Sequence, residues 1–330
     1  MSLPNAKRTA RHRAALAAIA ALLLAPMLHA APRPARARQP GAPAMRPVTD
    51  GMGRRVEVPV AARRVVSLAP NITDILYALG AGDKIAGITR LTSIPAGSPA
   101  KPSVGEPLEP NLERIAALHP DLVFASRTIN REETVESLQH LGIPVYVTYA
   151  NSVAGMLASV RQVAGLIGME PAGEKLTVRL EARLESLRAR LAGRPVKRVL
   201  FVVWQNPLIT TGEHTFIADA LRWAGARSVA QVGEDWPHIS MEEVVHLQPD
   251  DLIFSAAASG ASGDIAQSLQ NRPGWRDLKA VREGRVVMVS DAINAPSPKL
   301  VDAIEELARK LHPAAFAAGQ PSPAAGAAGR

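Results

Sequence analysis

The chain is built on an internal duplication, because three segments of its first half recur in the same order in its second half. Residues 64–66 correspond to 198–200, residues 113–124 to 242–254, and residues 141–147 to 281–289. In the central pair, ERIAALHPDLVF and EEVVHLQPDDLIF, a glutamate stands five residues before a leucine, and a Pro-Asp pair begins two residues after that leucine. A repeated pattern of this length predicts two similar lobes, and the boundary between two domains is a common place for a ligand pocket. We therefore expect a cleft that holds a ligand.

Both halves alternate short apolar runs with helical patterns, which predicts an α/β fold with parallel sheets. Parallel strands need crossover connections and are buried on both faces, so they read as short continuous apolar runs. Strands are expected at 65–69, 85–89, 122–125, 145–149, 199–204, 251–255 and 286–290. Helices are expected at 71–79, 111–118, 132–141, 215–224, 241–247, 265–271 and 297–311.

One long helix is expected to join the two lobes. The stretch 152–191 has a helical pattern broken near 169–173, and its second part carries leucines at helical spacing, namely Leu176, Leu180, Leu184, Leu187 and Leu191. A coiled-coil seam is the alternative, although the pattern lasts under three heptads. The expected organisation is a first lobe at 63–168, a connecting helix at 171–192, a second lobe at 195–313 and a disordered tail at 314–330.

The N-terminal residues predict an export signal at 1–31. Basic residues within 7–13 precede an apolar run at 14–28, and small residues follow that run. The run is shorter than the roughly 20 residues that span a bilayer, and an uncleaved membrane anchor is the alternative. Residues 32–62 are expected to form a flexible leader and the start of the mature chain, because 32–46 is rich in Ala, Pro and Arg.

Charge and cysteine content narrow the function further. The net charge of +8 comes mostly from the first 38 residues, which hold seven Lys and Arg and no acid, so the rest has 31 basic and 30 acidic residues. No basic surface for nucleic acid is therefore expected. The chain has no cysteine, hence no disulfide and no lipid-bearing cysteine after the signal. We expect an exported protein retained in the periplasm of a Gram-negative cell, and not a lipoprotein.

Polar and aromatic side chains follow the expected strands at the ends where ligands bind in open parallel sheets. The candidates for ligand contact are Pro70, Asn71, Arg127, Trp204, Asn206, Trp236, His238 and Asn294. Aromatic rings beside amides suit a large, flat and partly polar ligand. Trp204 follows a buried strand, so core packing is its alternative role, whereas Trp236 lies in a loop and is expected to face the cleft.

Glu113 and Glu242 occupy equivalent positions in the two halves. Each lies in the first turn of an expected helix, where the helix macrodipole favours negative charge, and each follows a capping residue, Asn111 or Ser240. A purely local role in the helix is therefore one interpretation. The other is docking, because related lobes would present the two carboxylates about a pseudo-twofold axis to a symmetric partner with arginine pockets.

Four segments are specific in combination, namely RRVVSLAPNITDILYALGAGDKIAGIT, EPNLERIAALHPDLVFAS, WQNPLITTGEHTFIADALRWAGA and WPHISMEEVVHLQPDDLIF. Together they resemble the periplasmic cobalamin- and iron-complex-binding proteins of ABC importers, over about 63–313, and the stretch 294–312 is closest to their cobalamin branch. It implies two parallel-sheet α/β lobes joined by one long helix, the class III or helical-backbone type of solute-binding protein. It also implies that Glu113 and Glu242 are the docking pair and that Trp236 faces the ligand.

The function implied by this resemblance is capture of cobalamin or a related corrinoid by a monomer that delivers it to a membrane ABC permease dimer. No cofactor, no metal site and no catalytic residue is implied. The chain departs from its relatives at Pro107 and Ser126, where cobalamin binders can carry aromatics, and at 294–299, where NAPSPK replaces an Arg-Pro-Gly-Pro-Arg stretch. We therefore expect an altered ligand pocket.

Two alternatives remain open. A haem or ferric-siderophore receptor of the same fold is the first, with His238, Tyr77 and His214 as exposed candidates for an axial ligand to haem iron. A periplasmic α/β enzyme is the second, but the chain lacks the Gly-x-Ser-x-Gly elbow, the phosphate loop and the His-Glu-x-x-His motif. Asp121 and Asp250 each follow a proline and are expected to shape turns.

Overall fold

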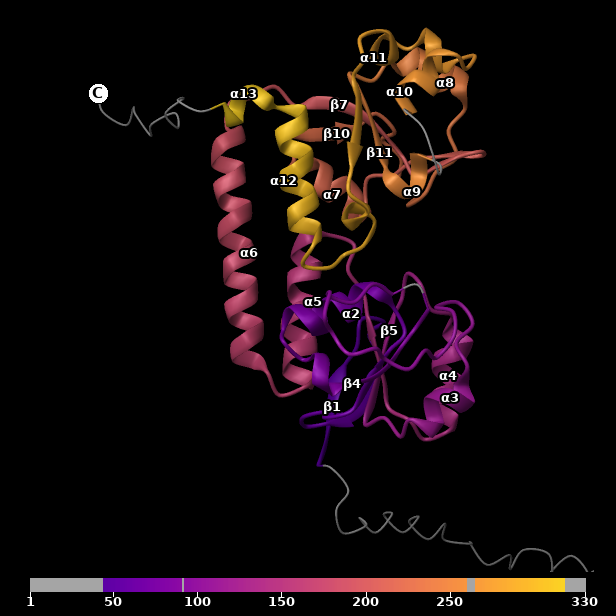
Figure 1. Ribbon diagram of the computed structural model, residues 1–330, viewed down its shortest axis with the longest axis vertical. Coiled ribbons are helices and arrows are strands. Elements are labelled where there is room, and N and C mark those ends of the chain that lie inside the picture. The colour runs from indigo at the N-terminus through magenta and orange to yellow at the C-terminus, as the bar shows by residue number, and fades with distance from the viewer. Residues whose placement is uncertain (1–43, 91, 260–264, 318–330) are drawn as a thin grey trace, which may run out of the picture. The chain divides into compact units, whose positions relative to one another are not determined.

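Two four-stranded parallel sheets with the same strand order form the framework of the structure (Figure 1). This computed structural model describes residues 44–90, 92–259 and 265–317, which lie within one structural unit. The first sheet has the order β4 (Ile85–Ile88), β3 (Val65–Ser67), β5 (Leu122–Ser126), β6 (Val145–Thr148). The second has the order β10 (Ala226–Ser228), β7 (Lys197–Val202), β11 (Asp251–Ser255), β12 (Val286–Val289). Matching strands take matching places, which confirms the duplication and the α/β fold class.

Helices connect the strands of each lobe. Those of the first lobe are α2 (Pro70–Ala78), η1 (Gly82–Lys84), α3 (Leu112–Ala117), α4 (Glu132–His140) and α5 (Val153–Leu166). Those of the second lobe are α7 (Phe216–Trp223), α8 (Met241–Leu247), α9 (Ala256–Ser259), α10 (Ile265–Gln270), η2 (Trp275–Asp277), α11 (Lys279–Arg282), η3 (Asp291–Asn294), α12 (Leu300–Leu311) and α13 (Pro313–Phe316). Within the described ranges, no helix has both the length and the apolar character needed to cross a bilayer.

The long helix α6 (Glu170–Leu191) joins the lobes and runs along one side of the unit (Figure 1). Its leucines at 176, 180, 184 and 187 are buried in the protein's own core, so they are not free to form the coiled-coil seam considered from the sequence. On its other flank, Arg183 donates hydrogen bonds to Glu305 (2.9 Å) and Asp302 (2.7 Å) of α12. The bond from Arg183 is the largest influence that lowers the pKa of the Glu305 carboxyl.

The apolar core is continuous between the lobes. Val66 of the first sheet and Leu200 of the second belong to separate clusters, each under the outer helices of its own lobe. Their strand neighbours Val65 and Val199 belong instead to one shared cluster that includes α2, α5, α6, α7 and α12. Burying one large apolar side chain stabilises a fold by about 1.5–3 kcal/mol, so separating the lobes would be costly.

The duplication extends to individual hydrogen bonds. In the first lobe, Asp121 Oδ2 accepts from the backbone N of Arg64 at 2.8 Å, and in the second, Asp250 Oδ2 accepts from Arg198 N at 2.8 Å. Each arginine side chain also donates to the carbonyl of the leucine five residues after the helix glutamate, at 2.5 and 2.8 Å. The residue after that leucine has a φ of 43° in one lobe and 41° in the other. Both aspartates thus hold turns, as expected.

Two segments outside the expected lobes are ordered in the structure. Residues 45–59, which lie in the stretch expected to hold a flexible leader and the start of the mature chain, form an antiparallel hairpin of β1 (Met45–Thr49) and β2 (Arg55–Pro59). Val56 and Val58 on β2 enter the core, so the first lobe begins about 20 residues before the expected boundary at 63. The tail expected to be disordered begins within α13, and the ring centroid of Phe316 in this helix lies 5.8 Å from the guanidinium carbon of Arg190. The signal at 1–31 and the tail from 318 onward lie outside the described residues.

Candidate functional site

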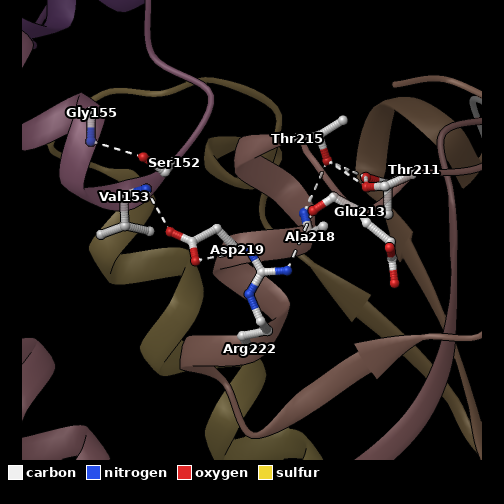
Figure 2. Close-up of polar contacts among 10 residues, drawn as sticks. Ser152, Val153, Gly155, Thr211, Glu213, Thr215, Ala218, Asp219 and Arg222 are labelled. Carbon is white, nitrogen blue, oxygen red and sulfur yellow. Dashed lines mark hydrogen bonds and ion pairs between the residues drawn. The ribbon is translucent and has the colours of Figure 1, made fainter. Parts of the chain in front are cut away.

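Two polar contacts connect segments that follow carboxyl ends of strands in different lobes. The backbone N of Val153, which starts α5 after β6, donates to Asp219 Oδ2 on α7 at 2.8 Å (Figure 2). Lys299 Nζ, just before α12, lies 2.5 Å from Asp74 Oδ1 on α2. Because α2 follows β3 and Lys299 follows β12 and η3, the carboxyl edges of the two sheets face each other. Ligands of open parallel sheets bind at this edge, so the candidate site lies between the two edges.

The contact at α5 is a joint made by side chains of both lobes. Asp219 also accepts from Arg222 at 3.1 Å, and its side chain is 18% exposed. Ser152 caps the same helix from its own lobe by accepting from Gly155 N at 3.0 Å, and Thr215 caps α7 (Figure 2). A carboxylate at the start of the 14-residue helix α5 is also favoured by the helix macrodipole. The joint therefore fixes the separation of the two edges at this point.

Two of the ligand candidates open helix α2 at the edge of the first lobe. Pro70 is the first helical residue and is half-buried, and Ala69 before it provides no side-chain cap. Asn71 is only 4% exposed, and its Oδ1 has no hydrogen-bond partner among the residues described. An unsatisfied buried polar atom costs about 1–3 kcal/mol. A hydrogen-bond donor from a ligand or a water molecule would remove that cost.

Arg127 is the third candidate of the first lobe, and it is exposed immediately after β5. Its guanidinium carbon lies 4.5 Å from the ring centroid of Tyr149, which immediately follows β6. The cation is therefore held against an aromatic face at the edge of the sheet.

A narrow antiparallel ribbon in the second lobe presents aromatic side chains on one face. Trp204 on β8 (Trp204–Gln205) pairs with Ile209 on β9 (Leu208–Ile209), and Ile209 pairs in turn with His238. Directly opposite residues of antiparallel strands point to the same face, and Trp236, two residues before His238, shares that face by alternation. Trp204 is 55% exposed and Trp236 is 39% exposed, whereas Pro237 and Ile239, which alternate with Trp236 and His238, are buried. Trp204 is thus a surface residue and not part of the core.

Backbone contacts fix the loop that carries Trp236. Three N–H groups within 210–213 donate to carbonyl oxygens of the loop 232–237 at 2.9–3.1 Å. A Cβ atom on Gly212 would lie 1.7 Å from the carbonyl oxygen of Glu234 in the same loop, so only glycine permits the approach. The ring of Trp236 meets that of Phe216 edge to face, with centroids 6.3 Å apart. Both the backbone and the ring of Trp236 are therefore held before a ligand arrives.

The two remaining candidates are asparagines, and each forms a hydrogen bond that holds a neighbouring residue in place. Asn206 lies in the β8–β9 turn, before the cis peptide bond to Pro207, and its carbonyl accepts from Trp204 Nε1 at 2.9 Å. Asn294 Nδ2 donates to Ser255 Oγ at 2.9 Å, at the carboxyl end of β11. Asn206 thus orients the ring of Trp204, and Asn294 fixes the end of a strand beside the site.

The candidates for an axial ligand to haem iron differ in accessibility. His238 and His214 are exposed, as expected. The expected exposure of Tyr77 is wrong, because its hydroxyl oxygen is buried and its ring lies over Gly82, where a Cβ atom would come within 2.8 Å of it. Among the described residues, no group of three or more His, Cys, Asp or Glu side chains could hold a metal ion.

Glu113 and Glu242 are exposed in the first turns of α3 and α8. Asn111 and Ser240 cap these helices by accepting from the backbone N three residues later, at 2.8 and 3.1 Å. In the part of the chain that the structure describes, neither glutamate forms an ion pair. Within the unit, α3 and α8 lie on the side opposite α6 (Figure 1). The two carboxylates are therefore equivalent charges with no counterion among the described residues.

Three residues of the site were missed from the sequence. Tyr149 follows β6 as Arg127 follows β5, so the rule that selected Arg127 could also have found it. Asp219 and Lys299 reach partners 66 and 225 residues away in the sequence. No local sequence pattern predicts such contacts, because they depend on how the two lobes are joined.

Comparisons with known proteins agree with this architecture. A family model described as "Periplasmic binding protein" matches residues 65–292. The "Uncharacterized ABC transporter substrate-binding lipoprotein YvrC" of Bacillus subtilis is 29% identical over 82% of this chain and 87% of its own length. The structure of the periplasmic vitamin B12 binding protein BtuF of Vibrio cholerae has a TM-score of 0.68 and 25% identity, covering 78% of this chain and all of that one. The apo periplasmic heme-binding protein RhuT of Roseiflexus sp. RS-1 has a TM-score of 0.69 and 26% identity, covering 77% and 100%.

Proposed function

The chain belongs to the periplasmic binding protein family, and from this premise we propose that it is the substrate-binding component of an ABC importer. Its ligand is cobalamin or a related corrinoid, captured in the periplasm and passed to a membrane permease. The lobes contribute opposite walls of the binding site, with Asn71 and Arg127 on the first and Trp204, Trp236 and His238 on the second.

The observation that carries this proposal is the exposed aromatic face of the ribbon at the carboxyl edge of the second lobe. Trp204 and Trp236 are large apolar rings left uncovered beside polar groups, which suits a large and flat ligand with a polar periphery. Their positions are held by Asn206 and Phe216 before binding, so little side-chain ordering is needed when a ligand is bound. The relative from Vibrio cholerae, named for vitamin B12 binding, supports a corrinoid as that ligand.

Haem is the second candidate ligand. His238 is exposed on the same face as the two tryptophans, and a histidine between aromatic rings could coordinate haem iron through a ring nitrogen. The relative from Roseiflexus, named for heme binding, supports this alternative.

The proposed activity is reversible binding, in which no covalent bond of the ligand is made or broken. The protein would act as a monomer in the periplasm and would need no cofactor, the corrinoid being its cargo. The names of its relatives as binding proteins support transport over catalysis. The continuous core and the unbroken helix α6 support small movements of the lobes on binding, because bending a helix disturbs its hydrogen bonds.

We assign Glu113 and Glu242 to docking on a dimeric permease. Their helices already have caps, so local stability does not require the glutamate side chains. At equivalent points of two similar lobes, carboxylates that pair with no described residue suit paired arginine sites on a symmetric partner.

Calorimetric titration with cobalamin, cobinamide, haem and a ferric siderophore tests the ligand. We expect the corrinoids to bind one to one, to be recovered unchanged and to quench tryptophan fluorescence. Of the four tryptophans, Trp223 on α7 lies outside the ribbon, so Trp223→Phe is the matched control that keeps ligand-dependent quenching, whereas Trp204→Phe reduces it. Haem binding that is lost in His238→Ala, together with no corrinoid binding, would establish the second candidate instead.

A further inference from the structure

Arg127 and Tyr149 form a fixed pair at the edge of the first lobe. Ser126, the last residue of β5, is in register with Thr148, the last residue of β6, so Arg127 and Tyr149 are the next pair along the same parallel ladder. The backbone N of Arg127 continues the ladder by donating to the carbonyl of Thr148 at 2.9 Å. The register therefore places the guanidinium over the ring, 4.5 Å from its centroid.

The backbone of this segment is rigid. Asn130 Oδ1 accepts from Ser126 N at 2.8 Å, and Asn130 Nδ2 donates to the carbonyls of Leu68 and Pro107 at 3.0 and 2.7 Å. The side chain of Asn130 thus ties the residues after β5 to two other segments of the lobe. The backbone of Arg127 is therefore held by hydrogen bonds, and its guanidinium is held against the ring of Tyr149.

This charge has no counterion within the described ranges. Some other arginines of the lobe do have one: Arg90 pairs with Glu106 at 3.0 Å, and Arg131 pairs with Glu109 at 3.2 Å. Arg127 instead keeps the planar face of its guanidinium on Tyr149, and the guanidinium N–H groups donate no hydrogen bond to a described residue. It stands at the sheet edge that faces the second lobe, where an anionic group could reach it.

We propose that Arg127, oriented by Tyr149, binds an anionic oxygen group at the periphery of the transported ligand. The proposal rests on the proposed function and adds the chemical group that the first lobe recognises. A guanidinium presents parallel N–H donors that match the paired oxygens of a phosphodiester or a carboxylate. In cobalamin this group is the phosphodiester of the nucleotide loop, and in haem it is a propionate carboxylate.

The test compares corrinoids with and without the nucleotide loop that carries the anionic group, and asks whether each substitution affects only the ligand that has this loop. The purified full chain and the variants Arg127→Met, Arg127→Lys, Tyr149→Leu and Tyr149→Phe are titrated with cyanocobalamin and with cobinamide, which lacks the phosphodiester. Arg127→Met should raise the Kd for cyanocobalamin about tenfold, as expected for a lost hydrogen bond between charged groups, and should change the Kd for cobinamide less than about twofold. Tyr149→Phe, which keeps the ring, should bind like the parent protein, while Tyr149→Leu should repeat part of the loss.

Salt provides a second readout. The affinity of the parent protein for cyanocobalamin should fall with ionic strength, because a partly exposed ion pair is screened, and this dependence should disappear in Arg127→Met. An unchanged Kd for cyanocobalamin, or an equal loss for both corrinoids, would overturn the subsite. Thermal unfolding of each variant identifies any loss that comes from misfolding.

Titration with haem distinguishes a failure of the proposed subsite from a failure of the corrinoid assignment. If the parent protein binds haem and neither corrinoid, the corrinoid assignment fails, and the subsite is judged by haem against its dimethyl ester. A loss in Arg127→Met confined to haem would then support the subsite, and an equal loss with both compounds would overturn it.

Discussion

Removing the ring of Trp236 should weaken ligand binding by an amount set by its uncovered surface. Trp236 is 39% exposed, and a tryptophan buries up to about 250 Å² when fully covered, so about 100 Å² remains for a ligand. At about 25 cal/mol per Å² of apolar surface, full coverage of that area is worth about 2.5 kcal/mol. Trp236→Ala should therefore raise the Kd for the corrinoid by at most about seventyfold, and by at least the fivefold that corresponds to about 1 kcal/mol.

Trp204 offers a ligand more uncovered surface than Trp236 does. Trp204 is 55% exposed, which leaves about 140 Å² of its surface for a ligand and a maximum of about 3.4 kcal/mol. Trp204→Ala should thus cost more binding free energy than Trp236→Ala. Trp236→Phe is the matched control, because a phenyl ring keeps an edge-to-face contact with Phe216 and part of the apolar area.

Isothermal titration at 25 °C with cyanocobalamin measures these differences, and circular dichroism verifies that each variant is folded. A folded Trp236→Ala protein with the affinity of the parent would refute the placement of Trp236 in the site. A larger loss in Trp236→Ala than in Trp204→Ala would instead show that uncovered area does not govern the energetics of the aromatic face.

Three further predictions concern docking, the joint between the lobes and pH. Replacing Glu113 and Glu242 together by Ala should leave ligand affinity unchanged and abolish uptake through the permease; unchanged uptake in cells would contradict the docking role. Asp219→Ala should lower the free energy of urea unfolding by about 1–3 kcal/mol, because it leaves a helix N–H unpaired, and Asp219→Asn should lower it less; equal losses would show that charge has no part in the joint. Burial lowers the pKa of His312, so the unfolded chain binds this proton more tightly, and stability should be complete above about pH 6.5 and decrease as the pH falls below it. Urea unfolding at pH 7.5 and 5.5 should show this decrease, and His312→Gln should reduce it; an unchanged difference between the two pH values would assign the effect to other groups.

The framework of the fold could be predicted because its signals are local and repeated. Seven of the eight strands of the two main sheets coincide with apolar runs flanked by helical patterns, and the duplication supplies each expectation twice. The strand Ala226–Ser228 was missed because it is three residues long and contains the exposed Arg227. The hairpin Met45–Pro59 was missed for a different reason, since its alternating pattern directly follows a composition typical of disorder.

The site was less predictable because its decisive contacts are made between elements distant in sequence. The strand-end rule found Arg127 and Trp204, but it could not tell whether Trp204 is buried. The structure answers this because β7 ends at Val202 and the chain then enters a two-residue strand that pairs with β9. The pairing of Ile209 with His238, which aligns the aromatic face, involves an isolated bridge and has no detectable periodicity in the sequence.

The duplicated and the divergent parts of the two lobes have different locations, and this separation supports an asymmetric ligand. The features that repeat in detail, such as the bonds of Asp121 and Asp250, lie where strands begin, and the capped glutamates repeat at the starts of helices. The carboxyl edges differ, because the first lobe presents a cation held on a tyrosine ring and the second presents two exposed tryptophans and a histidine. A ligand that satisfies both edges must combine an extended apolar face with an anionic group at its periphery. A small inorganic anion would leave the aromatic face uncovered, and a purely apolar molecule would leave the charge of Arg127 without a counterion.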